Sequence, residues 1–158
     1  MRRFSRWLAV GLLVLGAPAW ADEDKVPLDK VPAPVMKALK AKYPKAEVVT
    51  AEKADQDGKQ VYEFDLKEGE RKWEASFSPE GKFVGSEEAV AEADLPAKVK
   101  AAFAKKYPGA KVLSAEKAVT GEGASAKVVY EIVTQTDKGK VEAEFDPDGK
   151  FIAEEKVK

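Results

Sequence analysis

Hydrophobic residues recur every four positions in two stretches of the chain, and the two stretches match each other. They are Val31, Val35, Leu39 and Tyr43 in the first stretch, and Leu95, Val99, Phe103 and Tyr107 in the second. This spacing places one apolar stripe along one face of a helix. The proline after each tyrosine disfavours the helical conformation of that tyrosine. The pattern therefore predicts two amphipathic helices, and we interpret each Tyr-Pro pair as a helix end with a core aromatic rather than as a binding site.

After each helix, apolar residues alternate with polar ones, which is typical of strands that bury one face. Four such segments follow the first helix, at residues 46–53, 60–67, 71–78 and 82–88. Four more follow the second helix, at residues 110–117, 127–135, 140–146 and 150–156. The connections are short and rich in Gly and Asp, so consecutive strands are expected to pair antiparallel.

The two halves of the chain are copies of one unit. Tyr43 matches Tyr107 and Phe83 matches Phe151. The number of residues between matched positions is larger for Phe83 and Phe151, because one Gly-rich loop is longer in the second copy. The helix of each copy is the available cover for its apolar sheet face. The predicted fold class is therefore α+β, with two tandem repeats, each one helix packed on a four-stranded antiparallel sheet. We place the first repeat at residues 31–88, a linker at residues 89–94 and the second repeat at residues 95–156.

The N-terminal stretch, residues 1–21, has the composition of a secretory signal. The basic stretch MRRFSR precedes the apolar stretch WLAVGLLVLGA, and the Ala-Trp-Ala that follows fits a signal-peptidase site. The apolar stretch is shorter than the roughly 20 residues of a membrane span. We expect a signal peptide at residues 1–21, a lead-in at residues 22–30, and a periplasmic or secreted protein without a membrane span. A retained membrane anchor is the alternative.

Composition excludes several classes of chemistry. The chain has 27 basic and 28 acidic residues, which are interspersed, so it lacks the clustered basic face of a nucleic-acid-binding protein. It contains no Cys and no His, which removes thiol nucleophiles, imidazole general bases and the usual zinc ligands. We therefore expect no enzyme activity and no cofactor.

Two turn sequences and one tryptophan have alternative interpretations. The stretches Asp55–Gly58 and Asp146–Gly149 each contain two carboxylates, but a calcium loop needs more oxygen ligands at fixed spacing. We interpret both stretches as tight turns and expect no metal site. The alternation of apolar residues places Trp73 in the core with Phe77, although an exposed tryptophan would be a candidate binding residue.

The polar face opposite the helices is the candidate functional surface. Its expected residues are Glu63, Asp65, Glu74, Ser76, Glu131, Glu142 and Glu144. Two close carboxylates can act as an acid–base pair, but such a pair needs a cleft that perturbs a pKa. We expect an open, solvated face and no catalytic residue.

The motifs of the two copies resemble those of a known family. The shared elements are a Pro-Ala at the helix start, the Tyr-Pro pair, Ala-Glu-Lys, Val-Tyr-Glu, and the glycine of the last hairpin, Gly81 or Gly149. Over residues 31–155 this pattern resembles the PepSY-like family, which is grouped by fold with the beta-lactamase inhibitor protein. That inhibitor presents the concave polar sheet face of two such units to a target enzyme. This chain differs in having no cysteines, and its expected open face has no aromatic anchors.

The resemblance and the residues together favour a binding module. We expect a non-enzymatic protein-binding module that inhibits or regulates an envelope enzyme through its open sheet faces. The partner is expected to be an envelope protein, with no nucleic acid involved. The alternative is sensing or buffering of a small ligand or cation by the charged face.

The signal interpretation predicts the N-terminus of the exported protein. Cleavage after the Ala-Trp-Ala site makes Asp22 the first residue, because signal peptidase recognises small residues at this spacing. Intact mass spectrometry of the protein from the envelope fraction measures this directly. An exported chain that still begins with Met1 would contradict it.

Overall fold

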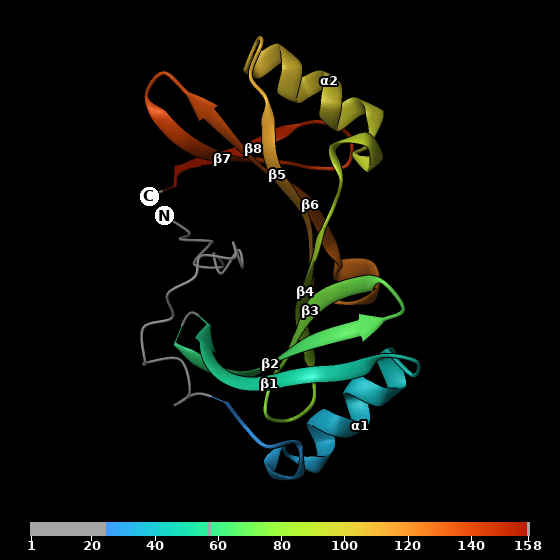
Figure 1. Cartoon of the computed structure of the whole chain (residues 1–158). Coiled ribbons are helices and arrows are strands. Elements are labelled where there is room, and N and C mark those ends of the chain that lie inside the picture. The colour runs from blue at the N-terminus through green and yellow to red at the C-terminus, as the bar shows by residue number, and fades with distance from the viewer. Residues whose placement is uncertain (1–24, 57, 158) are drawn as a thin grey trace.

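The computed structural model describes residues 25–56 and 58–157 (Figure 1). The predicted signal peptide, part of the lead-in, and Asp57 lie outside the described residues. The helices are η1 (Leu28–Lys30), α1 (Ala33–Lys42), η2 (Glu92–Asp94), α2 (Ala97–Lys106) and η3 (Gly123–Ser125). The strands are β1 (Glu47–Gln56), β2 (Lys59–Glu68), β3 (Arg71–Phe77), β4 (Phe83–Ala89), β5 (Val112–Thr120), β6 (Lys127–Thr136), β7 (Gly139–Phe145) and β8 (Phe151–Lys156).

All eight strands form one antiparallel sheet in chain order. The sheet curves, and α1 and α2 lie on its convex side (Figure 1). The α+β class is confirmed, but the division into two four-stranded sheets is not. The fourth strand pairs with the fifth, with Gly85 opposite Thr120 and Ala89 opposite Glu116. No helix in the described part of the chain is long and apolar enough to cross a membrane.

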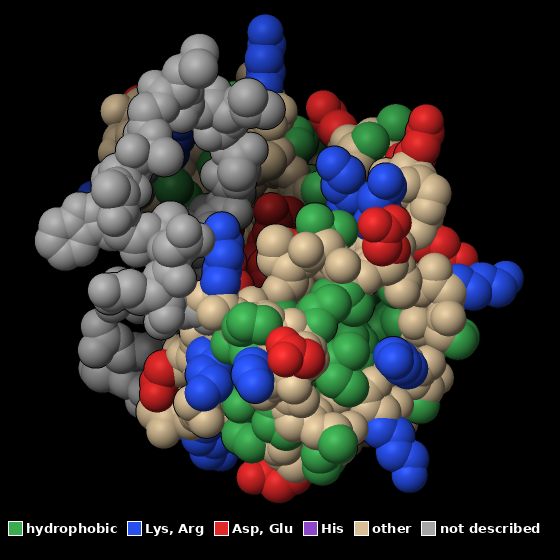
Figure 2. Space-filling model, turned by 60° about the horizontal axis from the view of Figure 1, so that its bottom comes forward, with side chains coloured by type: hydrophobic (Ala, Val, Ile, Leu, Met, Phe, Trp, Pro, Cys, Tyr) green, Lys and Arg blue, Asp and Glu red, His purple; other side chains and the backbone are tan. Residues whose placement is uncertain are grey.

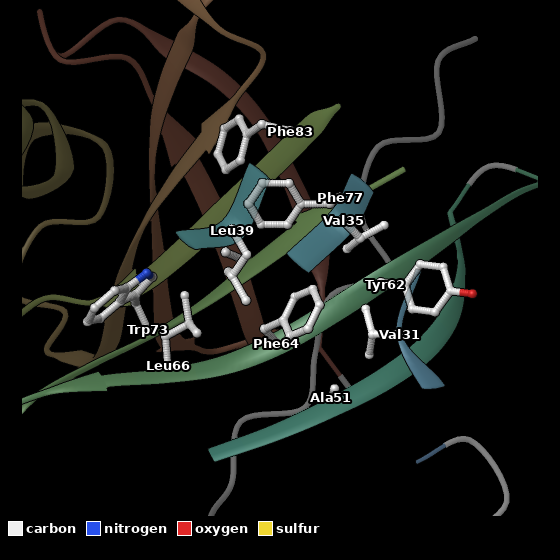
Figure 3. Close-up of a cluster of buried hydrophobic side chains, with 11 residues drawn as sticks. Val31, Val35, Leu39, Ala51, Tyr62, Phe64, Leu66, Trp73, Phe77 and Phe83 are labelled. Carbon is white, nitrogen blue, oxygen red and sulfur yellow. The ribbon is translucent and has the colours of Figure 1, made fainter. Parts of the chain in front are cut away.

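The first core lies between α1 and strands β1 to β4 (Figure 3). Val35 and Leu39 of α1 pack with Phe64 and Phe77 of the sheet. Trp73 is only 6% exposed and belongs to the same cluster, so its predicted place in the core is confirmed.

The helices end at the predicted tyrosines. Tyr43 is the residue after α1, and its backbone N–H still donates to the Leu39 carbonyl at 2.8 Å. Its ring lies 5.4 Å from that of Trp73. In the second copy the Tyr107 ring lies 5.4 Å from Phe103, in a core that includes Ile132 and Phe145. Each tyrosine is partly buried against its core, as the helix-end interpretation requires.

A glycine in the last hairpin of each copy lets that hairpin contact the helix. Gly81 has φ +84° and Gly149 has φ +79°, in the left-handed region that other residues rarely adopt. A Cβ at Gly81 would lie 2.5 Å from the Pro34 carbonyl oxygen, and a Cβ at Gly149 would lie 2.5 Å from that of Lys98. The shared hairpin glycine therefore has two physical causes, the backbone conformation and the close approach of the helix.

These two causes can be separated by experiment. Gly109 has a similar φ of +76°, but nothing lies within 4 Å of a Cβ added there. Substituting Ala at either glycine costs about 1–2 kcal/mol for the left-handed backbone. Gly149→Ala adds a clash with backbone, so we expect it to lower the free energy of unfolding by about 1–3 kcal/mol more than Gly109→Ala. Urea denaturation measures both, and equal losses would show that the helix contact is loose.

Candidate functional site

The sheet register places all seven predicted site residues on the face opposite the helices. Glu63 lies opposite Ser76, and Asp65 lies opposite Glu74. In the second copy Glu131 lies opposite Glu144, and Glu142 follows on the same face of β7. The buried core residues alternate with them on the other face. The structure thus brings the seven residues onto one surface, on the concave side of the sheet.

Four further carboxylates lie on this surface that the sequence reasoning did not select. Glu52 lies opposite Glu63, Glu87 opposite Glu74, Glu116 opposite Glu131, and Glu155 opposite Glu142. Each of these glutamates is adjacent along its strand to a residue of the opposite face: Ala51, Ser86, Ala115 and Glu154. This alternation is the sequence signal that could have identified them. We call the complete set of ten carboxylates the acidic face: Glu52, Glu63, Asp65, Glu74, Glu87, Glu116, Glu131, Glu142, Glu144 and Glu155.

The carboxylates of the acidic face form rows across neighbouring strands. One row runs across β2, β3 and β4 through Asp65, Glu74 and Glu87. A second row runs across β5, β6 and β7 through Glu116, Glu131 and Glu144. Paired strands lie about 4.8 Å apart, and like charges directly opposite each other are destabilising. Figure 2 shows acidic side chains deep in the hollow between the two halves of the molecule.

The expectation of a solvated face is wrong for most of its carboxylates, although Asp65 and Glu155 are exposed. Glu142 is 5% exposed and Glu144 is 9% exposed, while Ser76 is fully buried and donates weakly to the Gly85 carbonyl at 3.4 Å. The reason is the continuous sheet: a curved surface of eight strands encloses its concave face more than two separate four-stranded sheets would. The carboxylates are therefore held in a partly desolvated environment.

Desolvation and mutual repulsion shift the ionisation of these groups. Burial, followed by repulsion from Glu131 and Glu116, raises the pKa of Glu87 to about 9. Burial and the neighbouring carboxylates raise the pKa of Glu131 to about 8. The same two causes raise the pKa of Glu74 and that of Glu142 to about 7. At neutral pH the centre of the acidic face therefore holds protons that ordinary glutamates would have lost.

The carboxylates at the centre of the acidic face have carboxylates rather than cations as their main charged neighbours. The ion pairs between described residues lie elsewhere, such as Arg71 with Glu88 at 2.6 Å and Lys98 with Asp148 at 2.6 Å. The polar contacts of the face come from uncharged groups, since Thr50 donates to Asp65 and the Gln56 amide donates to Glu63 at 3.0 Å. The causes that shift the pKa values of Glu74, Glu87, Glu131 and Glu142 include other carboxylates and no cation.

The pocket that the described residues form beside the acidic face is small, and these residues form no metal cluster. A pocket of about 50 Å³ lies at the junction of the two copies, lined by residues that include Glu74, Ser76, Gly85, Glu87 and Thr120. Sites for small molecules are typically about 300–1,000 Å³. Among residues 25–56 and 58–157, no group of three or more acidic residues is arranged to hold a metal ion.

The two turn stretches use their aspartates in the turn itself. Asp146 Oδ1 accepts hydrogen bonds from the backbone N–H groups of Asp148 and Lys150, each at 2.9 Å. Asp55 Oδ1 accepts from the backbone N–H of Gly58 at 2.8 Å. These contacts are typical of Asx turns, in agreement with the turn interpretation.

The sequence matches one family model twice. The model, described as "Putative beta-lactamase-inhibitor-like, PepSY-like", matches residues 18–85 and residues 72–153. No curated protein sequence matches the chain significantly.

Solved structures of similar fold come from Bacteroides species. One, from Bacteroides eggerthii, is titled a "putative periplasmic" protein; it is 20% identical, with a TM-score of 0.65 over 79% of this chain and 88% of its own. A BLIP-like protein from Bacteroides fragilis is 21% identical, with a TM-score of 0.65 over 84% of this chain and 88% of its own. A DUF2874 family protein from Bacteroides uniformis is 20% identical, with a TM-score of 0.65 over 78% of this chain and 88% of its own. At these identities the likeness shows the shared fold.

The raised pKa values predict a stability that falls with rising pH. A carboxyl whose pKa is higher in the folded chain binds its proton more tightly there than in the unfolded chain, where its pKa is near 4.5. Between pH 4.5 and about 9 the folded state therefore holds more protons, and the free energy of unfolding decreases as the pH rises. We expect the melting temperature to fall steadily from pH 5 to about pH 9.

Glu87→Gln should reduce this pH dependence, because the neutral amide removes the most strongly shifted group. At pH 8 we expect it to raise the free energy of unfolding by on the order of 1 kcal/mol, after allowance for screening by solvent. Calorimetric melts across the pH range measure the effect. Glu92→Gln, in the exposed helix η2, is the matched control for the loss of one carboxyl group outside the acidic face. A melting temperature that is flat between pH 5 and 8 would contradict the desolvated state of the face.

Proposed function

Because the chain belongs to the PepSY-like, beta-lactamase-inhibitor-like family, we propose that it is a non-enzymatic module that binds an envelope protein on its acidic face. The bound protein presents a basic surface and is inhibited or regulated by being held there. The observation that supports this most strongly is the crowding of ten carboxylates on one surface. Burial and mutual repulsion raise the pKa values of Glu74, Glu87 and Glu131 at its centre, so a cation placed there would favour their ionised form.

A basic partner would relieve the strain that these carboxylates impose on the fold. Lysine or arginine side chains placed against the rows would stabilise the ionised form and lower the pKa of each carboxyl that they contact. Binding would therefore release protons at neutral pH. Long-range attraction would also speed association at low ionic strength.

Other features agree with a binding role in the envelope. The N-terminal sequence has the pattern of a secretory signal, and one protein of similar fold is titled periplasmic. The absence of His and Cys from the sequence removes the commonest general bases and nucleophiles. The face has no exposed aromatic anchors, so we expect a dissociation constant of roughly micromolar size.

Capture from an envelope extract, followed by binding measurements with the purified partner, tests the proposal. The test variant has Glu63, Glu74, Glu131 and Glu142 replaced by Gln, which removes four carboxyl groups that a basic partner would ionise and keeps side-chain size. The control variant removes four charges from exposed loops and turns: Glu70→Gln, Glu92→Gln, Asp94→Asn and Asp137→Asn. We expect the test variant to lose at least about tenfold in affinity, which is about 1.4 kcal/mol, and the control to retain wild-type affinity.

Two outcomes would contradict this function. Equal affinity of the two variants would show that net charge or another surface, such as the loop at residues 121–126, controls binding. Saturable binding of calcium in a calorimetric titration, with no protein captured, would favour the alternative of cation sensing by the same face. The amide replaces each carboxylate at nearly constant size. Circular dichroism of both variants verifies that the fold is retained.

A further inference from the structure

The two edges of the sheet are repeat equivalents of the two strands that pair at its centre. β8 corresponds to β4 in the alignment that matches Phe151 with Phe83, and β5 corresponds to β1 in the alignment that matches Tyr107 with Tyr43. The equivalence extends to backbone contacts. The backbone N–H of Val26 donates to the Ala51 carbonyl at 2.7 Å. At the equivalent position in the second copy, the backbone N–H of Val90 donates to the Ala115 carbonyl at 2.8 Å.

The central pairing therefore defines a register in which β8 of one copy could pair with β1 of another. At the centre, the pairs are Gly85 with Thr120, Ser86 with Val119, Glu87 with Ala118, and Glu88 with Lys117. The equivalent pairs between two copies are Ala153 with Gln56, Glu154 with Asp55, Glu155 with Ala54, and Lys156 with Lys53. The next position on β1, Glu52, is already paired with Lys25 of the same chain, and β8 ends at Lys156. Among the residues that the structure describes, the backbone thus offers four matched positions on each edge.

We propose that these edges fit a second copy of the chain in this register, and that the side chains of Ala153, Glu154 and Lys156 hold that copy off and keep the protein monomeric. An unpaired edge strand exposes backbone N–H and C=O groups that favour chain-to-chain pairing, and proteins commonly block such edges with charge. β8 also exposes Phe151 and Ile152, which makes an unblocked edge hazardous.

The first obstacle is steric. At the central junction a Cβ on Gly85 would lie 3.0 Å from the Val119 carbonyl oxygen, which is closer than ordinary contact. Glycine avoids this contact at the centre. The equivalent residue at the edge is Ala153, whose Cβ would meet the Asp55 carbonyl of a second copy in the same way.

The second obstacle is electrostatic. At the centre Glu88 lies opposite Lys117. The hydrogen bond from Arg71 is the main cause of the lowered pKa of Glu88, and attraction to Lys117 adds to it. At the edges the equivalent pair is Lys156 with Lys53, two like charges. The neighbouring pair changes from Ser86 with Val119 to Glu154 with Asp55, again two like charges. Like charges directly opposite each other in a sheet are destabilising, so both substitutions oppose pairing.

Converting the edge strand to the central sequence tests the proposal. The variant Ala153→Gly/Glu154→Ser/Lys156→Glu gives β8 the residues of β4 at the three positions. We expect it to associate head to tail, so that its weight-average mass in sedimentation rises to at least about twice that of the wild-type protein and continues to rise with concentration. Wild-type protein with the same N-terminus should remain a monomer over that range.

Two further variants identify the surface. Adding Lys53→Glu to the triple variant places Glu opposite Glu and should restore the monomer, because the new attraction becomes a repulsion. Replacing Lys156→Glu by Lys138→Glu, in the exposed turn between β6 and β7, keeps the net charge and should also give a monomer.

The triple variant loses the hydrogen bond that the Tyr107 hydroxyl donates to Glu154, and this loss could unfold the second copy. Ala153→Gly/Asp55→Lys/Lys156→Glu keeps Glu154, removes the steric obstacle and turns both like-charged pairs into attractive ones, so it decides the question if the triple variant does not fold. Self-association of this variant that Lys53→Glu abolishes would support the proposal. A folded monomer, or a wild-type protein that already associates through Lys53, would overturn it.

Discussion

The pairing of β4 with β5 is the constraint on which the rest of this structure depends. Each copy could bury its apolar face under its own helix, but only this pairing joins the strands into one sheet. It aligns the polar faces of the two copies, and it brings Glu87 and Glu116 close to each other at the centre of the molecule. The raised pKa of Glu87 follows from this arrangement, since Glu131 and Glu116 of the second copy are its largest sources of repulsion after burial.

The two cores supply the stability that such a face needs. Each consists of a short helix against one part of the sheet, with Phe64 and Phe77 in one copy and Ile132 and Phe145 in the other fully buried. The glycines Gly81 and Gly149 let the last hairpin of each copy come into backbone contact with the helix of that copy. An anionic surface that is unfavourable by itself can persist because the opposite side of the same strands is well packed. Such a surface is suited to a partner that brings the missing positive charge.

Local features of the fold were predictable from the sequence, and long-range features were not. The helix ends at Tyr43 and Tyr107, the alternation of the strands and the buried place of Trp73 follow from spacing and from proline chemistry. The single sheet depends on hydrogen bonds between β4 and β5, which α2 separates along the chain. The alternation within each strand does not indicate that these two strands pair. For the same reason the sequence indicated which side Glu142 and Glu144 face but not that they are buried, and it did not single out Glu87 or Glu116.

The central claim is that one continuous sheet forces these carboxylates together in a partly desolvated face. Titration of the side-chain carboxyl carbons by NMR measures it most directly, because each glutamate reports its own ionisation. The structure predicts that Glu87 and Glu131 titrate well above the ordinary value of 4.5, near pH 9 and pH 8, while the exposed Glu80 titrates below that value. Titration of Glu87 and Glu131 at their ordinary value would contradict this account of the face.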